Sequence, residues 1–316
     1  MRPIIIACAA ALVLMSSAAH AQSWQPPADT QRCPSQWGKD DQRGAANLMR
    51  PETVLRAARL IRTGEVIELG HVLSSTIPLS AGRRFELETK RTTMSSQSNR
   101  RGSNEELVVA EIGQVGTQFD GFAHQTIGNS LYNCFKVDEV STRNGFTRLG
   151  IQNVGALVTR GVMIDVAASK NVDMLADSYE ITVQDLQQAL AKQSLTLQSG
   201  DAVIIHTGFG KLWEKDNPRY SRGNPGIGVA AGEWLARQSP MLVGADTPPV
   251  EVNPNPDPQI SLPIHQIMLA INGIHLLENL KLDELAAKRV YEFAFIIEPL
   301  KLEGATGSTV APIAIR

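Results

Sequence analysis

Hydrophobic residues recur along the chain at two spacings, which predict a mixture of helices and strands. Helices are predicted where apolar residues return on one helical face, over residues 50–64, 182–192 and 228–238. Pro51 suits the first turn of the first helix, and Thr182 with Asp185 resembles a capping box. Runs of β-branched and apolar residues predict strands over 65–73, 107–113, 155–167, 201–208 and 289–300. Strands interspersed with helices indicate an α/β domain.

The N-terminus has the pattern of a secretory signal peptide over residues 1–21. Arg2 supplies the positive charge, a short apolar run follows, and Ala19 to Ala21 form a small-residue cleavage site. A membrane anchor is the alternative, but it needs about 20 apolar residues and this run is shorter. We therefore expect cleavage after Ala21 and export, to the periplasm in a Gram-negative host. Residues 22–50 are predicted to form an N-terminal arm, and residues 51–316 one domain.

The net charge indicates which binding partners to expect, and the cysteine content bears on the cellular compartment. The formal net charge of −2 gives no reason to expect binding to nucleic acid or to an anionic membrane. Cys8 lies in the signal segment, which leaves Cys33 and Cys134 either to pair as a disulfide after export or to stay unpaired. Residues 83–106 are polar and charged, which is typical of a flap or hairpin near a pocket, or of a solvated surface loop.

Two separated segments hold most of the side chains that bind metals or move protons. Gln114, Gln118, Asp120 and His124 lie close together in one segment, although the chain contains only six histidines. The second segment, near the C-terminus, contains His265 and Glu278. Clusters of this kind are how a folded enzyme assembles one pocket from distant parts of the chain.

The segment from Gly113 to His124 resembles the H-x-G-T-H-x-D-x-x-x-H signature of the cyclase family of metal-dependent hydrolases, which includes bacterial kynurenine formamidase and isatin hydrolase. Further segments look like the longer branch of that family: residues 37–49, 158–167, 200–210, 224–236, 243–251 and 298–315. The resemblance implies a cyclase-like β/β/α (swivelling-type) single domain with flanking helices, in a homodimer or homotetramer. It implies a small-molecule substrate.

The resemblance also implies a metal site, with two departures. The first two signature histidines, which bind metal in the family, are Gln114 and Gln118 here. The family's remaining ligands correspond to Asp120, His265 and Glu278, and its proton-transfer histidine to His124. We therefore predict a divalent ion, manganese or zinc, although amide oxygens suit harder ions better than zinc. Gln114 and Gln118 are predicted ligands; alternatively they bind substrate or only support the loop.

Local sequence patterns predict the secondary structure around the candidate site residues and the other histidines. Asp120 and His124 would share one face if a helix begins after Gly121. His265 follows Pro263 and should lie in the first turn of a helix, with Glu278 on a later strand or turn. His206 is expected to be a core or strand-end histidine, and His275 should face away from Glu278.

We predict an exported hydrolase that acts on a small amide, cyclic amide or lactone. The favoured target is a C–N bond other than a peptide bond. The reaction would be like that of an arylformamidase or a cyclic amidase. Metal-activated water would attack the carbonyl, and His124 would act as general acid and base. One alternative is a lyase or dehydratase of the same fold. The other is a non-catalytic protein that binds a small molecule.

Overall fold

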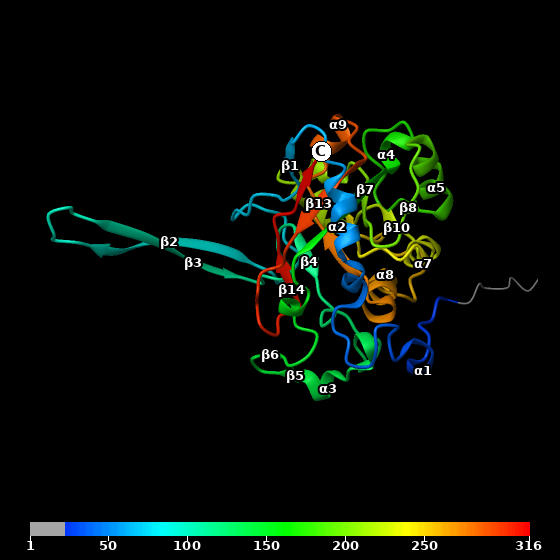
Figure 1. Cartoon of the computed structure of the whole chain (residues 1–316), viewed down its shortest axis with the longest axis horizontal. Coiled ribbons are helices and arrows are strands. Elements are labelled where there is room, and N and C mark those ends of the chain that lie inside the picture. Colours follow the sequence, from blue (N-terminus) through cyan, green and yellow to red (C-terminus); the bar gives the residue numbers. More distant parts are fainter. Residues whose placement is uncertain (1–22) are drawn as a thin grey trace, which may run out of the picture.

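The computed structural model describes residues 23–316, so the predicted signal peptide lies outside the described residues. A curled nine-stranded sheet forms the centre of the α/β fold (Figure 1). Its strands run in the spatial order β1 (Val66–Glu68), β15 (Ile313–Ile315), β13 (Glu292–Ile297), β7 (Leu157–Asp165), β9 (Ala202–His206), β11 (Leu242–Ala245), β12 (His275–Glu278), β4 (Gln118–Asp120) and β14 (Gly307–Thr309).

Shorter ladders and helices surround this sheet. The additional strand pairs are β2 (Phe85–Met94) with β3 (Gly102–Ala110), β5 (Ser141–Thr142) with β6 (Gly145–Phe146), and β8 (Glu180–Ile181) with β10 (Gly226–Ile227). The α-helices are α1 (Asp29–Arg32), α2 (Pro51–Ala58), α3 (Val137–Val140), α4 (Val166–Ser169), α5 (Val183–Lys192), α6 (Asn217–Arg222), α7 (Val229–Arg237), α8 (Pro263–His265) and α9 (Asp283–Ala287). The 3₁₀ turns are η1 (Gly44–Leu48), η2 (Tyr132–Cys134), η3 (Ile151–Asn153) and η4 (Phe209–Leu212), and α8 continues into the π-helix η5 (Gln266–Asn272).

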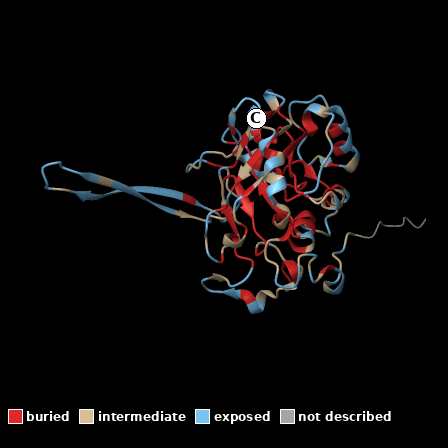
Figure 2. Cartoon of the chain, viewed as in Figure 1, coloured by how far each residue is buried: buried red, intermediate tan, exposed pale blue. Residues whose placement is uncertain are grey.

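The centre of the sheet is parallel and buried on both faces (Figure 2). Alternate residues of β9 show the two faces: Val203 and Ile205 join one apolar cluster, whereas Ala202 and Ile204 join another. Helices α5, α7 and η5 contribute to the first cluster, which explains their apolar faces. The predicted capping box at the start of α5 is confirmed, because Thr182 Oγ1 accepts a hydrogen bond from the Asp185 amide at 3.2 Å.

One predicted strand differs from the structure in its burial, and a neighbouring segment follows one of its predicted alternatives. Residues 107–113 were expected to form a buried strand, but β3 lies in a projecting hairpin where Leu107 and Val108 are about half exposed. The apolar run fits a strand but says nothing about what packs on it. For residues 83–106, the hairpin alternative is confirmed, since β2 and β3 pair antiparallel over most of that segment.

The N-terminal residues are tied to the body of the protein by a disulfide between Cys33 and Cys134, whose Cα atoms lie 6.0 Å apart. Nearby, Asp29 accepts hydrogen bonds from Arg32 and Lys136, both at 2.6 Å. Of the two cysteine alternatives, pairing is therefore the one that the structure holds. Among the described residues, none of the helices combines the length and apolar character needed to cross a membrane.

Candidate active site

Strand pairing brings the two candidate segments together. In the antiparallel pair β4–β12, Gln118 lies opposite Glu278 and Asp120 lies opposite Leu276. Residues two apart on a strand face the same side, so Gln118 and Asp120 point together towards Glu278, whereas Phe119 points into the core. All three polar side chains are buried, and Gln118 Nε2 donates to Glu278 Oε2 at 2.9 Å.

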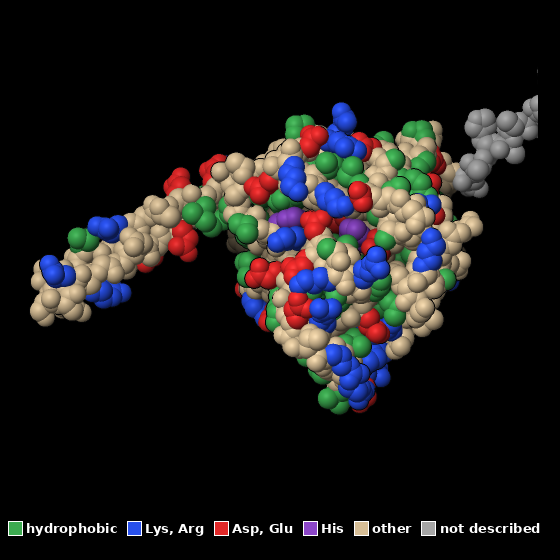
Figure 3. Space-filling model, turned by 90° about the horizontal axis from the view of Figure 1, so that it is seen from above, with side chains coloured by type: hydrophobic (Ala, Val, Ile, Leu, Met, Phe, Trp, Pro, Cys, Tyr) green, Lys and Arg blue, Asp and Glu red, His purple; other side chains and the backbone are tan. Residues whose placement is uncertain are grey.

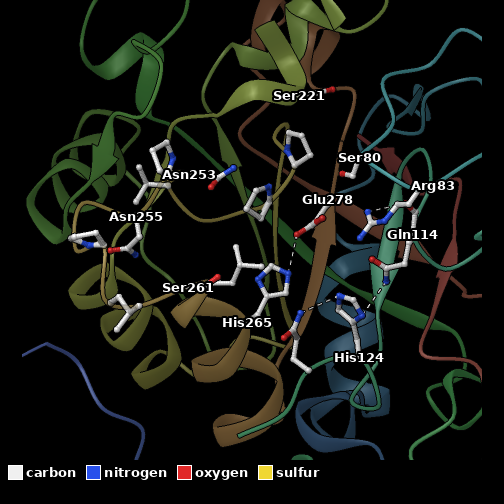
Figure 4. Close-up of a pocket in the computed structure, with 18 residues that line it drawn as sticks. Ser80, Arg83, Gln114, His124, Ser221, Asn253, Asn255, Ser261, His265 and Glu278 are labelled. Carbon is white, nitrogen blue, oxygen red and sulfur yellow. Dashed lines mark hydrogen bonds and ion pairs between the residues drawn. The ribbon is translucent and has the colours of Figure 1, made fainter. Parts of the chain in front are cut away.

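His265 approaches from the other side and faces both carboxylates. Its Nε2 lies 3.3 Å from Glu278 Oε1 and 3.6 Å from Asp120 Oδ2. It lies within the predicted first turn of a helix, because α8 begins at Pro263. Glu278 ends a strand, as expected. Figure 4 shows His265 and Glu278 directed towards each other among the residues that line the pocket.

Glu251 was not identified from the sequence, yet it holds His265 in place. Its carboxylate accepts hydrogen bonds from the backbone amides of Ile264 at 2.9 Å and His265 at 3.1 Å. It also lies 2.5 Å from His265 Nδ1. Leu262, the residue before α8, provides no side-chain cap, so Glu251 satisfies amides at the start of this helix from a distant segment. Glu251 thereby fixes the ring so that Nε2 faces Asp120 and Glu278.

His124 reaches the pocket by a different route from the one predicted. No helix follows Gly121; the chain makes a turn in which the His124 amide donates to the Gly121 carbonyl at 3.1 Å. The helical interpretation is wrong: the segment makes only this one turn, and the hydrogen bond from the Gly121 amide to the Thr306 carbonyl at 2.8 Å ties its start to the segment just before β14. The His124 ring nevertheless lies 5.9 Å from the His265 ring, centroid to centroid.

Gln114 and Gln118 both face the cluster through their amide nitrogens. Gln114 Nε2 lies 3.2 Å from Asp120 Oδ1 and 3.3 Å from His124 Nδ1. Gln118 Nε2 donates to Glu278 and lies 3.4 Å from Gln114 Oε1. In this arrangement the amides act as hydrogen-bond donors to the carboxylates. Their role as metal ligands, which requires the carbonyl oxygens to turn inwards, stays a prediction.

Burial and neighbouring charge shift the pKa values of the cluster in different directions. Burial, with the negative charge of Glu278, raises the pKa of Asp120 to about 8. Burial and the nearby His265 lower the pKa of His124 to about 4, so its imidazole is neutral near pH 7. Burial alone would lower the pKa of His265, but hydrogen bonds to Glu251 and Glu278 outweigh it and raise the pKa well above its ordinary value.

These residues fit a divalent cation. Asp120, His124 and His265 can each offer one ligand atom within 4.8 Å of the others. Asp120 Oδ2 and Glu278 Oε1 are buried beside His265 Nε2, at 3.6 and 3.3 Å, and a divalent cation held among these three atoms would compensate the buried carboxylate charge. Carboxylate and imidazole groups are ligands that zinc and manganese both accept. The geometry therefore also makes His124 a possible ligand, beside the proton-transfer role predicted for it.

The cluster lies at one side of a cavity of about 530 Å³. A proline-rich wall faces it, formed by Pro248, Pro249, Pro254 and Pro258. Arg83 is the one arginine or lysine that lines this cavity, and its Nη1 donates to the Gln114 carbonyl at 3.0 Å. Arg83 lies just before β2 in a segment distinguished only by its polar and charged residues, so no local signal selects it.

The other two assigned histidines lie outside this pocket. His206 ends β9 and is buried, with Nδ1 2.8 Å from Asp165 Oδ1, in agreement with the expected strand-end position. His275 is buried against Phe122, with ring centroids 4.1 Å apart, and its Nδ1 lies 3.1 Å from the Asp120 carbonyl oxygen. It starts the strand that Glu278 ends and packs in the core.

Comparison with known proteins shows which family this chain belongs to. The Cyclase family model matches residues 67–252. The chain is similar to the crystal structure of a novel cyclase, with 32% sequence identity and a TM-score of 0.81 over 89% of this chain and 98% of that one. No curated protein matches it.

Two more distant structures share the fold. Isatin hydrolase A from Ralstonia solanacearum has 22% identity and a TM-score of 0.55, covering 80% of this chain and 92% of that one. A predicted metal-dependent hydrolase from Bacillus stearothermophilus has 16% identity and a TM-score of 0.50, covering 79% and 97%.

Proposed function

Because the chain belongs to the cyclase family, we propose that it is a metal-dependent hydrolase of small amides, cyclic amides or lactones. The observation that carries this proposal is the buried cluster of Asp120, His265 and Glu278, with His124 beside it, at the side of a cavity large enough for a small molecule. The names of the two distant structural relatives support it, since both are hydrolases by name.

Asp120, His265 and Glu278 would hold the ion, and Glu251 would keep His265 Nε2 turned towards it. A bound divalent ion would lower the pKa of water and polarise the substrate carbonyl. The cation would also oppose the mutual repulsion of Asp120 and Glu278, which are both buried. This arrangement needs no side-chain nucleophile, because water attacks the carbonyl directly.

His124 would move the proton. Its neutral imidazole can accept a proton from the attacking water and deliver it to the leaving nitrogen or oxygen. Gln114 Nε2 lies 3.3 Å from His124 Nδ1 and would orient the ring. On this assignment the products are a carboxylate and an amine or alcohol, joined in one molecule when the substrate is cyclic.

Arg83 indicates which chemical group the substrate carries. A guanidinium at a pocket wall is suited to bind a carboxylate or a similar anion through two parallel hydrogen bonds. Its Nη1 donates to the Gln114 carbonyl, while Nη2 and Nε have no hydrogen-bond partner within residues 23–316. The charge of Arg83 also lowers the pKa values of Asp120 and His124, which places it within electrostatic reach of the cluster. The preferred substrate therefore carries an anionic group in addition to the scissile bond.

Replacement of Arg83 by Gln should weaken binding of an anionic ligand about tenfold, because a hydrogen bond to a charged group is lost. The measurement is calorimetric titration of metal-loaded protein with succinate and with its monoamide, succinamate. The variant should lose the preference for succinate. The neighbouring exposed residue supplies the control, Arg84→Gln, which should behave as wild type. An unchanged preference for succinate in the Arg83 variant would remove this residue from substrate recognition.

The two glutamines offer a test of where the metal lies. Gln114→His combined with Gln118→His should raise zinc affinity by at least about tenfold, because imidazole nitrogen is a better zinc ligand than an amide oxygen. Competition with a chromophoric zinc chelator measures the affinity. Gln125→His, a pocket-lining control, should give no gain because Gln125 does not contact either carboxylate. If the double variant also gains nothing, Gln114 and Gln118 do not face the ion.

We further propose that the protein is exported, to the periplasm in a Gram-negative host, and functions as a homodimer or homotetramer. The disulfide between Cys33 and Cys134 supports export, because such bonds persist in oxidising compartments.

The direct test of the proposed function is the metal content of the mature protein, purified without chelator and then dialysed against manganese or zinc. About one tightly held ion per chain, with turnover of a lactone or amide that chelation abolishes, is the expected result. A small-molecule-binding protein would retain ligand without turnover. A lyase or dehydratase would release product without added water, as mass spectrometry would show. Failure to retain any ion would contradict the metal-dependent mechanism.

A further inference from the structure

Neutral polar side chains line much of the cavity away from the metal cluster (Figure 4). They are three serine hydroxyls and two asparagine amides, from Ser80, Ser221, Ser261, Asn253 and Asn255. The three serine hydroxyls have no hydrogen-bond partner within residues 23–316. We call these five side chains the polar rim. Because hydroxyl and amide groups both donate and accept hydrogen bonds, the polar rim is suited to a ligand that does the same.

Asn253 is a firmly positioned member of the polar rim. Its backbone amide donates to the Asn224 carbonyl at 3.0 Å, and its own carbonyl accepts from the Asn224 amide at 2.8 Å. Asn224 is fully buried, and its Nδ2 donates to the carbonyls of Pro249 at 3.0 Å and Glu251 at 2.9 Å. The Asn253 side chain makes no hydrogen bond among the described residues and is directed into the cavity (Figure 4). A free amide on a fixed backbone is preorganised for a ligand.

No ring of Phe, Tyr or Trp lines this cavity in the described part of the chain. Pockets for planar organic ligands usually present apolar and aromatic side chains to the flat faces of the ligand. Here the polar rim lies on several sides of the cavity (Figure 4). A planar aromatic ligand would cover these hydroxyls and amides without replacing their hydrogen bonds to water. A site with such groups discriminates against ligands that lack matching polar groups.

Ser80 places a hydroxyl beside the Arg83 guanidinium. Both residues belong to a single turn, in which the Arg83 amide donates to the Ser80 carbonyl at 3.1 Å. Acidic and basic side chains are interspersed over most of the face that Figure 3 presents, and the formal net charge is −2. Broad electrostatic attraction therefore does little to select an anionic ligand. Selection depends instead on Arg83 and on the hydrogen-bonding groups around it.

We propose that the substrate is a polyhydroxylated lactone that carries a carboxylate, of the kind formed when a dicarboxylic sugar acid cyclises. This inference rests on the proposed function, since it names the substrate of the same site. Arg83 binds the carboxylate, Asn253 and the serines of the polar rim bind ring hydroxyls, and the lactone carbonyl lies at the metal cluster. Water adds across the ester bond of the ring: the acyl carbon becomes a carboxylate, the ring oxygen leaves as a hydroxyl, and one proton is released.

The distribution of the polar rim favours hydroxyls over other polar groups. A planar cyclic amide presents its donors and acceptors along its edge and leaves both faces apolar. The hydroxyls of a sugar-acid lactone project from successive saturated carbons, above and below the ring. They therefore meet polar groups on several sides of a cavity at once, which is how the polar rim is arranged (Figure 4).

Equilibrium binding tests this recognition without relying on turnover. The probes are trihydroxyglutarate and α-hydroxyglutarate, which represent opened lactones and differ only in two hydroxyls. Both contain an α-hydroxy acid, so chelation of the metal by that group does not distinguish them. In calorimetric titration of the metal-loaded mature chain, trihydroxyglutarate should bind at least about tenfold more tightly, because two neutral hydrogen bonds are added. Equal affinities, or no binding of either probe, would overturn the inference.

Asn253→Leu removes the amide and keeps a similar bulk. The variant should bind trihydroxyglutarate about tenfold more weakly, because the hydrogen bonds of the amide are lost, and its preference over α-hydroxyglutarate should fall. The matched control is Asn144→Leu, at an exposed asparagine in the turn between β5 and β6, which should behave as wild type. Circular dichroism and metal content check that each variant is folded and loaded. An unchanged preference in folded Asn253→Leu would reject recognition of hydroxyls by the polar rim.

Turnover separates a wrong substrate class from a wrong function. The γ-lactones of trihydroxyglutaric and α-hydroxyglutaric acid differ only in two ring hydroxyls, and dihydrocoumarin supplies a planar aromatic lactone. The first should be opened with a kcat/KM at least about tenfold above the other two. Faster opening of either other lactone would reject the substrate class while supporting a hydrolase. Tight binding of trihydroxyglutarate without metal-dependent turnover of any lactone would support the recognition and contradict the proposed function.

Discussion

Replacement of His124 by Ala is expected to lower kcat by about 10²–10⁴-fold, the usual contribution of general acid–base catalysis. The physical reason is that His124 is the neutral imidazole beside Asp120 and His265, where a proton must leave the attacking water and reach the leaving group. The measurement is steady-state turnover of the best amide or lactone substrate, together with the metal content of the same sample. The fold and the bound ion should remain.

Metal content separates proton transfer from ligation, because His124 can also offer a ligand atom close to Asp120 and His265. Loss of the ion in His124→Ala would make His124 a ligand. His124→Gln adds a second readout, since an amide can coordinate metal but cannot exchange a proton near neutral pH. If His124 transfers the proton, both variants should keep the ion. Both should also lose the part of the pH dependence of kcat that comes from titration of the His124 imidazole. Full turnover in either variant would exclude His124 from the mechanism.

The sequence located most of the cluster but not how it assembles. Asp120 and His124 were selected because they lie in a dense polar segment that resembles a family signature, and Glu278 because it belongs to a second such segment. These side chains come together because β4 pairs with β12. The two strands are far apart in the sequence, since Gln118 and Glu278 are separated by 160 residues. Local spacing cannot specify which distant strands pair, and the family resemblance supplied that expectation.

Local patterns failed where tertiary contacts decide the backbone. A helix after Gly121 would have placed Asp120 and His124 on one face, but the chain makes a single turn closed by the hydrogen bond from the His124 amide to the Gly121 carbonyl. Both side chains still reach one pocket, because Asp120 leaves the end of a strand and His124 follows the turn. The apolar run at 107–113 predicts a buried strand for a similar reason. Its hydrophobicity is real, but Leu107 and Val108 lie in a projecting hairpin and are about half exposed.

Arg83 and Glu251 were missed because no local spacing assigns either a role, although Glu251 ends one of the segments that resemble the family. Arg83 is one of several charged residues in a polar segment, and only the fold shows that it lines the cavity while Arg84 faces solvent. Glu251 follows a pair of prolines, 14 residues before His265. A carboxylate partner is a common feature of metal-binding histidines, so a search for one was justified. The sequence alone could not choose Glu251 among the other acidic residues.

Replacement of Glu251 by Gln is expected to weaken metal binding about 10–100-fold, the usual cost of losing the partner of a ligating histidine. The amide keeps the shape of Glu251 and can still accept one hydrogen bond from His265 Nδ1. It removes the negative charge that makes His265 Nε2 a better donor to a cation. The same loss should lower the pKa of His265 in metal-free protein, because hydrogen bonding to Glu251 is the first effect that raises it against burial.

Two measurements test this role of Glu251. Chelator competition gives the affinity for manganese and zinc, and NMR titration of metal-free protein follows the His265 ring. The matched control is Glu233→Gln, a glutamate on α7 that accepts a hydrogen bond from Trp24 at 3.2 Å and does not contact His265. Unchanged affinity with a folded Glu251→Gln variant would show that Glu251 only caps α8. Weaker metal affinity together with a lowered pKa of His265 would instead show that the negative charge of Glu251 strengthens metal binding through His265. A residue that only capped α8 would not change the pKa of His265 in this way.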